Sequence, residues 1–208
     1  MPLTWYFDFI SPFAYLQWQK IKTLHDSGVA VEPVPIVFAA VLSARGQKGP
    51  AEIPGKREFT YRHVLWQAVR EGIELRFPPA HPFNPLPSLR LCIAAGSGIA
   101  AVDAIFDRIW RQGEAVDSAG AIAPLARALG IPADAIDRAD VKDALRANTG
   151  RALDAGVYGV PTLAIGDQLF WGNDAHDFAM AVLADPALPA SAEMQRVSSL
   201  PVGVQRRG

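Results

Sequence analysis

Ser11 stands where an apolar run ends and a helix is expected to begin. The run reads WYFDFI over residues 5–10, and Ser11-Pro12 follows it directly. Serine is a preferred N-cap and proline is favoured in a first turn, so the pair predicts a helix start without implying a function. The same position also suits chemistry. A helix N-terminus favours an anion, and a serine hydroxyl there can donate to a thiolate and lower the pKa of that thiol.

Two later stretches could bind a ligand. The sequence GVYGVPT covers residues 156–162. Pro161 is consistent with a simple turn, but a bend there would leave the backbone N–H and C=O of Val160 free to pair with an extended peptide. The sequence FWGND covers residues 170–174 and predicts a helix capped by Asn173 or Asp174. A functional alternative places a ligand carboxylate on that helix N-terminus and a ligand ammonium on Asp174.

The chain provides little for metal or redox chemistry. Its one cysteine, Cys92, lies in an apolar helical stretch and is expected to be a small buried residue. The four histidines are scattered and show no metal-ligand spacing, so we expect no metal. A thiol–disulfide enzyme with its active site at the start of this first helix needs a cysteine there. Ser11-Pro12-Phe13-Ala14 occupies that place and contains no thiol. A Ser-His-Asp hydrolase is not recognisable around Ser11, although its partners could be distant in sequence.

Composition excludes several partners. Of the 208 residues, 50% are hydrophobic and 20% charged, which is a globular composition, and the formal net charge is −1. No basic cluster precedes Arg206-Arg207, so a nucleic-acid or anionic-membrane surface is not expected. No apolar run is long enough to span a bilayer, and the N-terminus lacks the features of a secretion signal. We therefore expect a cytoplasmic, metal-free protein.

The periodicity of apolar residues predicts strands at both ends of the chain and helices between them. At the front we expect a strand over 3–9, a helix from Pro12 to about Gly28, and a strand over 29–34 whose prolines suggest an edge position or an early end. At the back we expect strands over 160–165 and 168–171 around a turn at 166–167, then a helix over 175–183. The middle predicts a loop over 45–55, an extended proline-rich segment over 77–89, and helices at 57–72, 89–95, 100–112, 121–129 and 141–155.

This order predicts an α/β protein with a thioredoxin-like fold and a large, mostly helical insertion. A βαβ unit and a ββα unit bracket the insertion. The expected thioredoxin-like domain is discontinuous, over 1–37 and 156–184, and the helical insertion domain covers 38–155. Residues 185–208 are rich in Pro, Ala and Ser and are expected to form a C-terminal tail outside the core.

Five motifs in order resemble one family. They are FDFxSPFxYL, KGPAEIPGK, NPLPSLR, GVYGVPT and FWGND, within residues 3–184. Together they resemble the 2-hydroxychromene-2-carboxylate isomerases, which belong with the kappa-class glutathione transferases in the disulfide-oxidase branch of the thioredoxin superfamily. Each motif alone is weak, but their order and spacing are specific.

The resemblance implies glutathione as cofactor. Ser11 matches the serine that stabilises the glutathione thiolate. Val160, before a cis Pro161, matches the residue whose backbone pairs with the cysteinyl part. Asn173 and Asp174 match the pair that receives the γ-glutamyl end.

The resemblance also implies a second group of contacts, around the substrate. Lys56 matches a lysine near glutathione or substrate, and Gln47 falls where kappa-class members have asparagine, so its amide is one carbon longer. Asn84 and Phe13 are expected on the substrate side, with Phe38 and Trp66 as further aromatic walls.

The implied reaction interconverts 2-hydroxychromene-2-carboxylate and trans-o-hydroxybenzylidenepyruvate, or a close aromatic analogue, through a reversible glutathione-thiolate adduct. The partner is thus a small aromatic carboxylate, and the family resemblance suggests a homodimer. A kappa-type transferase would use the same thiolate but release a conjugate. A non-catalytic module that binds a peptide in the same groove is a third alternative; loss of Ser11 or Asp174 would indicate it, and both residues are present.

Overall fold

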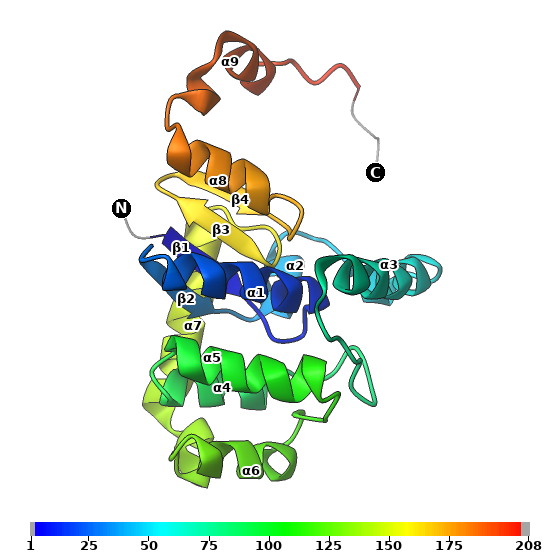
Figure 1. The fold of residues 1–208 in the computed structure, drawn as a ribbon, viewed down its shortest axis with the longest axis vertical. Helices are drawn as coiled ribbons and strands as arrows, with labels where there is room; N and C mark the ends of the chain where they lie inside the picture. Colours follow the sequence, from blue (N-terminus) through cyan, green and yellow to red (C-terminus); the bar gives the residue numbers. More distant parts are fainter. Residues whose placement is uncertain (1–2, 205–208) are drawn as a thin grey trace.

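The computed structural model describes residues 3–204 and contains a four-stranded mixed sheet (Figure 1). Its strand order is β2-β1-β3-β4, where β1 pairs parallel with β2 and antiparallel with β3, and β3 and β4 form a hairpin. The strands are β1 (Leu3–Phe7), β2 (Val31–Pro35), β3 (Thr162–Ile165) and β4 (Gln168–Trp171). The prolines of β2 lie at an edge of the sheet, as predicted.

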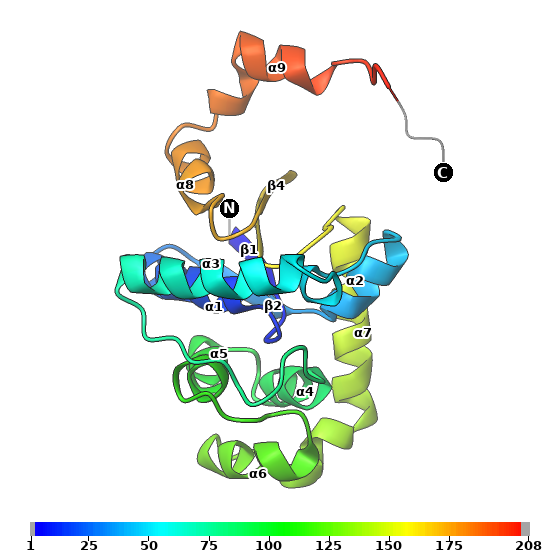
Figure 2. The same cartoon turned by 90° about the vertical axis from the view of Figure 1, so that its right-hand side faces the viewer.

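Helices cover both faces of the sheet. α1 (Pro12–Asp26) and α8 (His176–Ala184) lie on one face, and α7 (Ala139–Asp154) lies on the other (Figures 1 and 2). This arrangement, with β1-α1-β2 at the front and β3-β4-α8 at the back, confirms the thioredoxin-like fold. Among residues 3–204, none of the helices combines the length and apolar character that crossing a bilayer requires.

The segment between β2 and β3 is mostly helical, as expected. It contains α2 (Phe38–Ala44), a 3-10 turn η1 (Pro50–Glu52), α3 (Lys56–Glu71), α4 (Leu86–Ala94), α5 (Ile99–Phe106) with a π-helical continuation η2 (Asp107–Arg111), α6 (Ala119–Ala128) and η3 (Ala133–Asp137). α4, α5 and α6 form a layer at one side of the sheet, whereas α3 stands apart from them and packs beside α1 (Figures 1 and 2).

α7 contacts both the helical layer of the insertion and the sheet. Leu145 belongs to the larger buried cluster with the helical layer, whereas Ala152 packs with Val34, Ile36 and Val157 on the opposite face of the sheet. The boundary that we expect at residue 155 stays a prediction, because one helix serves both regions.

The middle of the chain contains one helix that was not predicted, α2, and one expectation that is wrong, the length of the proline-rich segment. The sequence did not predict α2. Its first backbone N–H groups are bound by side chains that lie far away in sequence: Val37 donates to Thr149 Oγ1 (3.1 Å) and Phe38 donates to Asp8 Oδ2 (2.9 Å). The proline-rich segment is extended only up to Pro85, since α4 already begins at Leu86. Pro87 lies in its first turn, where a missing N–H breaks no helical hydrogen bond.

From Asp185 to residue 204 the chain contains no buried residue, and the division of residues 185–208 from the rest as a tail stays a prediction. This segment forms two short helical pieces that were not predicted, η4 (Leu188–Ala190) and α9 (Ala192–Ser198). Nearly all side chains from residue 189 to residue 204 are exposed or partly exposed, and the segment projects beyond α8 (Figure 1).

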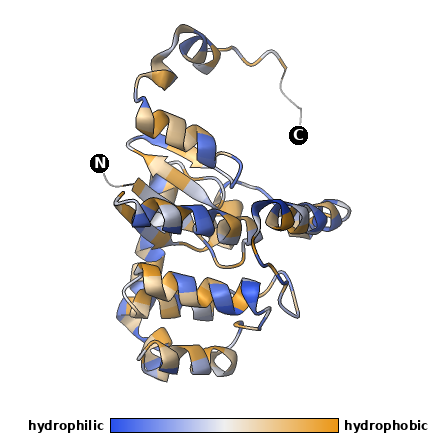
Figure 3. Ribbon diagram, viewed as in Figure 1, coloured by the Kyte–Doolittle hydropathy of each residue, from blue (hydrophilic) through white to orange (hydrophobic). Residues whose placement is uncertain are grey.

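The main core is aromatic and joins the sheet to the helical insertion. Trp5 stacks on Phe7 and on Trp18, with ring centroids 4.4 and 5.3 Å apart, and Phe106 of α5 completes the cluster. Trp110 is fully buried, and its Nε1 donates to the carbonyl of Phe9 (2.8 Å). Figure 3 shows the apolar residues running through the strands and the α4–α5 layer. The end of β1 is therefore fixed by the insertion itself.

Gln17 connects this core to the turn after β4. Its amide is fully buried, accepts from Trp5 Nε1 (2.7 Å) and donates to the carbonyl of Gly172 (3.0 Å). One side chain thus satisfies a polar group of β1 and another of the turn after β4.

We predict that Gln17→Leu lowers the free energy of unfolding by about 2–4 kcal/mol, because it leaves a buried indole N–H and a carbonyl without partners. Urea unfolding of the variant measures this loss. Gln19→Leu is the control: this side chain is partly exposed and makes one long bond, to the Tyr15 carbonyl (3.4 Å). Equal losses in the two variants would contradict the role of Gln17.

Candidate active site

The turn between β1 and α1 presents Ser11 at a helix N-terminus. Ser11 is the N-cap of α1, and its Oγ accepts from the backbone N–H of Ala14 (3.2 Å), as predicted. The first turn of α1 contains no acidic residue, so the positive end of its dipole is not neutralised locally. Because Oγ acts as an acceptor inside the protein, the hydroxyl hydrogen remains available to a ligand.

Asp8 fixes the turn between β1 and α1 by hydrogen bonds. The Asp8 side chain is fully buried and accepts from the N–H of Ile10 (Oδ1, 3.1 Å) and from the N–H of Phe38 (Oδ2, 2.9 Å). Its backbone carbonyl accepts from the N–H of Ser11 (3.1 Å). Burial raises the pKa of this carboxyl to about 7, and the backbone N–H donors oppose that rise. Asp8 therefore joins the N-termini of α1 and α2. Sequence reasoning missed it, although an acidic residue in an apolar strand was a visible signal.

Val160 lies opposite this turn. The Val160–Pro161 peptide is cis, and Thr162, the first residue of β3, pairs with Tyr6. Tyr6 is the last β1 residue paired with β3, and Val160 comes two residues before Thr162, so Val160 lies at the end of the sheet from which the turn to Ser11 leaves. Within residues 3–204, neither polar backbone group of Val160 has a hydrogen-bond partner. Ser11 and a free strand-like edge thus meet at the same end of the sheet.

Asn173 and Asp174 follow β4 at that end. The N–H of Gly172 donates to the carbonyl of Pro161 (2.9 Å), which ties the two segments together. The expectation that Asn173 or Asp174 caps α8 is wrong: Ala175 is the N-cap, and no side chain bonds to it. Asn173 is buried and instead donates from Nδ2 to Glu71 of α3 (3.4 Å), whereas Asp174 is exposed.

Two buried polar atoms near the start of α8 lack partners among the described residues. They are Asn173 Oδ1 and His176 Nδ1, on side chains that are 3% and 8% exposed. Burial and the nearby Lys20 lower the pKa of His176, which keeps its ring neutral. Glu71 Oε1 accepts from both Lys20 (3.3 Å) and Asn173. Glu71 and His176 had no sequence signal, because only the fold brings α1, α3 and α8 together.

The other expected residues lie on the connection from α2 to α4. Gln47 and Lys56 are exposed, and Lys56 is the first residue of α3. Phe38 is the first residue of α2, where its N–H meets Asp8. Asn84 is exposed, with its amide bonded to Leu86 N–H (3.2 Å) and to the Asp117 carbonyl (3.4 Å), so its substrate role stays a prediction.

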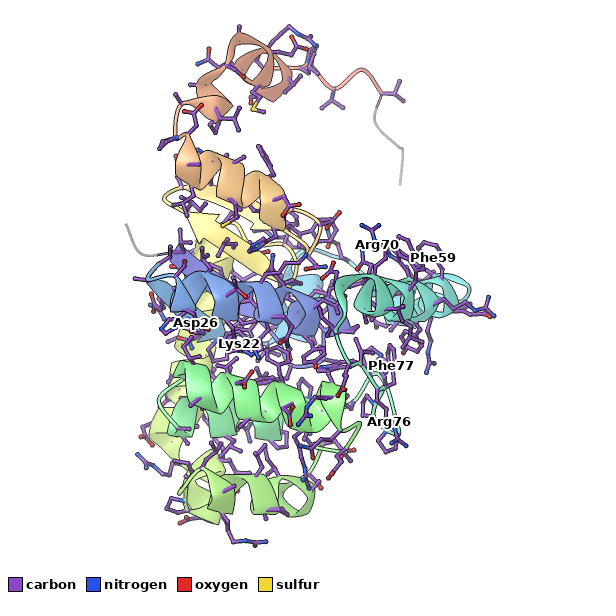
Figure 4. The ribbon with its side chains drawn as sticks, in the orientation of Figure 1. Lys22, Asp26, Phe59, Arg70, Arg76 and Phe77 are labelled. Atoms are coloured by element: carbon purple, nitrogen blue, oxygen red, sulfur yellow. The ribbon has the colours of Figure 1, made fainter. Side chains whose placement is uncertain are left out.

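An aromatic row on α3 begins beside Phe13. The ring of His63 lies 6.1 Å from that of Phe13, and it stacks with Phe59 (5.5 Å) and Trp66 (5.9 Å). The guanidinium of Arg70 covers Trp66 at 4.8 Å. Figure 4 labels Phe59 and Arg70 on this helix. His63, which was not predicted, connects Phe13 to the expected aromatic wall at Trp66.

Two hollows open elsewhere on the surface. One, of ≈390 Å³, is lined by residues such as Tyr6, Ala155 and Leu169. Another, of ≈710 Å³, includes Lys22 and Asp26 on the outer side of α1 (Figure 4). Neither hollow includes Ser11, Val160 or Asn173. The candidate site is therefore identified by the polar groups that lie together at one end of the sheet, and not by a cavity.

Cys92 is the small buried residue that the sequence predicts. It is fully buried in α4, and burial raises its pKa to about 12. Such a thiol is not a nucleophile at neutral pH.

The sequence and the fold of this chain are similar to those of known proteins. Residues 3–184 match the family model "DSBA-like thioredoxin domain". The 2-hydroxychromene-2-carboxylate isomerase of Pseudomonas putida is 32% identical over 187 residues, covering 84% of this chain and 90% of that protein. The chain belongs to the 2-hydroxychromene-2-carboxylate isomerase family.

Further relatives of this isomerase family extend the match. The enzyme of that name from Sphingobium xenophagum is 30% identical, over 88% of this chain and 98% of that protein. A solved 2-hydroxychromene-2-carboxylate isomerase superposes with a TM-score of 0.77 at 26% identity, covering 93% of this chain and 99% of that one. A Caenorhabditis elegans protein named glutathione S-transferase kappa 2 is 26% identical over 87% of this chain and 91% of its own length. The family resemblance, the fold class and the expectation of an isomerase are confirmed.

We predict that Asp8 makes the protein less stable as pH rises from about 4 to about 7. Its folded pKa of about 7 exceeds the ordinary value of 3.8, so the folded state keeps a proton that the unfolded state releases in this range. A pKa that differs by one between the folded and unfolded states corresponds to about 1.4 kcal/mol, so the loss across this range is roughly 4 kcal/mol. Urea unfolding between pH 4 and pH 7 should show that the free energy of unfolding falls more steeply with pH in the wild type than in Asp8→Asn.

Carboxyl ¹³C shifts of Asp8 provide a direct check in the unmodified protein. A midpoint near the ordinary value of an aspartate, together with equal pH slopes for wild type and Asp8→Asn, would contradict this account.

Proposed function

We propose that the protein is a glutathione-dependent isomerase that interconverts 2-hydroxychromene-2-carboxylate and trans-o-hydroxybenzylidenepyruvate, or a close aromatic analogue. The observation that carries this proposal is the meeting of Ser11, at the uncompensated N-terminus of α1, with the free backbone of Val160. The position that a redox relative would fill with its own cysteine holds a serine, so the reacting thiol must arrive on a ligand.

The residues present fit glutathione. A γ-glutamyl group has both an ammonium and a carboxylate, and the segment after β4 offers the exposed Asp174 carboxylate and the N-terminus of α8. The partnerless Asn173 Oδ1 and His176 Nδ1 are further polar atoms that a ligand could satisfy. Val160 would pair with the cysteinyl backbone as a strand pairs with its neighbour.

When bound, glutathione would supply a thiolate for reversible addition to the conjugated substrate, which would allow rotation about the former double bond. The free hydroxyl hydrogen of Ser11 would be donated to that sulfur, and the α1 dipole would favour the negative charge there. Asp8 keeps Ser11 in place by fixing the turn before it.

The substrate side lies between α1 and α3. Lys56 is the proposed partner of the substrate carboxylate, and Phe13 with Trp66 would flank its aromatic ring, joined by His63. Gln47 and Asn84 are retained as proposed contacts, to glutathione and to substrate respectively, and Phe38 as a proposed wall. A cytoplasmic location suits this function, because glutathione is the reducing thiol of that compartment.

A kappa-type transferase is the second candidate, favoured by the similarity to the kappa 2 protein. Both enzymes need the same thiolate, so binding does not separate them. The products do: an isomerase regenerates glutathione, whereas a transferase consumes it in a conjugate.

We predict that the protein with catalytic glutathione converts a hydroxychromene carboxylate to its benzylidenepyruvate isomer, which absorbance follows. Ser11→Ala should reduce kcat about 10- to 100-fold because a donor to the thiolate is lost. Ser118→Ala is the matched control: Ser118 is also an N-cap, and its Oγ also accepts at 3.2 Å, from Ala121. Both variants should lose about 1 kcal/mol of stability, but only Ser11→Ala should lose activity.

Stoichiometric loss of glutathione into an adduct would replace the isomerase by the transferase. Absence of any glutathione-dependent turnover would refute both enzymes. Equal activity of Ser11→Ala and Ser118→Ala would show that Ser11 acts only as a helix cap.

We also propose a homodimer in which the outer side of α3 is covered by a second copy. Phe59, Leu65 and Val69 are 66%, 42% and 81% exposed on this helix, which is an unusual set of apolar side chains for a free surface. Sedimentation equilibrium should give twice the chain mass for the wild type and a smaller mass for Val69→Glu. A wild-type monomer at micromolar concentration, or an unchanged dimer in the variant, would contradict this interface.

A further inference from the structure

Side chains hold both polar groups of Ile10, the residue before Ser11. Its N–H donates to Asp8 Oδ1 (3.1 Å), and its carbonyl faces His81 Nε2 (2.8 Å). The carbonyl of Ile10 and the N–H of Ser11 belong to one peptide group, and that N–H donates to the Asp8 carbonyl. The peptide that leads into the N-cap of α1 is therefore bound at each end, once by a neighbour in sequence and once by a residue of the proline-rich segment.

The hydrogen-bond partners fix which nitrogen of the His81 ring carries a hydrogen. The Ile10 carbonyl can only accept, so Nε2 must be that nitrogen. The hydroxyl of Tyr61 on α3 lies 2.6 Å from Nδ1 and also donates to the His81 carbonyl (2.9 Å), so its one hydrogen is shared between these two acceptors. Burial lowers the pKa of His81 and the nearby Arg57 adds to this, whereas the hydrogen bond to Ile10 opposes it, so the ring is neutral at pH 7.

Arg57 binds both Tyr61 and the backbone of His81. Its Nε donates to the Tyr61 oxygen (3.2 Å) and its Nη2 donates to the His81 carbonyl (2.7 Å). The hydrogen bonds thus form a continuous chain from Arg57 through Tyr61 and His81 to the Ile10 carbonyl. A chain of this kind strengthens each of its bonds by polarisation. Phe77 and Trp110 pack edge-on to the ring at 5.8 and 5.6 Å and limit its rotation (Phe77 is labelled in Figure 4).

We propose that His81 is a positioning residue for Ser11: as a neutral imidazole it holds the Ile10–Ser11 peptide from Nε2 and, through Tyr61 and Arg57, links the N-terminus of α1 to α3. This inference rests on the proposed function, in which Ser11 stabilises a glutathione thiolate. The consequence is that the thiolate side and the substrate side of the site share one rigid connection. A shift of α3 moves the peptide that places Ser11.

The test measures the thiol pKa of bound glutathione from the ultraviolet absorbance of the thiolate, together with kcat and KM. In His81→Leu the Ile10 carbonyl loses its donor, so the thiol pKa should rise by about half to one unit and kcat should fall about 10-fold, with little change in the KM for substrate. His81→Gln should restore most of both values, because a glutamine amide N–H can occupy the place of Nε2. Tyr61→Phe keeps the Nε2 donor and should give an intermediate shift. His25→Gln, at an exposed histidine on α1, is the control and should change nothing.

The wild type is measured first. If it does not lower the thiol pKa of glutathione, the proposed function fails and the inference fails with it. If the wild type lowers that pKa and His81→Leu lowers it equally with unchanged kcat, only the inference is overturned. If His81→Leu does not fold, Tyr61→Phe decides: an unchanged thiol pKa and kcat there overturn the link to α3, and a shift supports it. Failure of His81→Gln to restore the thiol pKa also overturns the inference.

Discussion

The buried carboxyl of Asp8 is the interaction on which the site depends. It accepts from Ile10 and from Phe38, so one side chain fixes the turn before α1 and the beginning of α2. A fully buried carboxyl is costly, and its pKa near 7 reflects that cost. The buried Asp8 carboxyl lies where the thioredoxin-like part joins the helical insertion. Ser11 and the beginning of α2 are both positioned by hydrogen bonds to this residue.

Around that turn, side chains of the insertion supply hydrogen-bond partners for backbone groups that the sheet does not pair. Trp110 holds the carbonyl of Phe9, His81 holds that of Ile10, and Thr149 holds the N–H of Val37. Each bond joins a part of the insertion to the end of a strand or its connection. The insertion therefore takes part in setting the geometry of the turn that carries Ser11.

Local patterns were enough to predict much of the fold. Alternating apolar residues gave β1, and Ser11-Pro12 gave the start of α1 because a cap is a local signal. The sequence could not predict α2, whose N-terminus is bound by Asp8 and Thr149, 30 and 112 residues away. The same limit applies to the site: motif order led to Ser11, Val160 and Asn173, but Glu71, His81 and His176 have meaning only after α1, α3 and α8 are packed together. The cap of α8 was misjudged because Asn173 turns to Glu71 instead.

The two prolines of β2 have a consequence for how this protein meets others. Ile36 donates its N–H to Phe7, so alternate residues of the strand direct their N–H groups toward β1, and those of positions 33 and 35 point outward. β2 has three outward positions, 31, 33 and 35, and two of them are proline, which has no N–H to offer. The edge formed by β2 therefore lacks two of the three donors with which a further strand would pair, whereas β4, the other edge, contains no proline. The prolines that mark an edge position in the sequence thus also disfavour edge-to-edge aggregation on this side of the molecule.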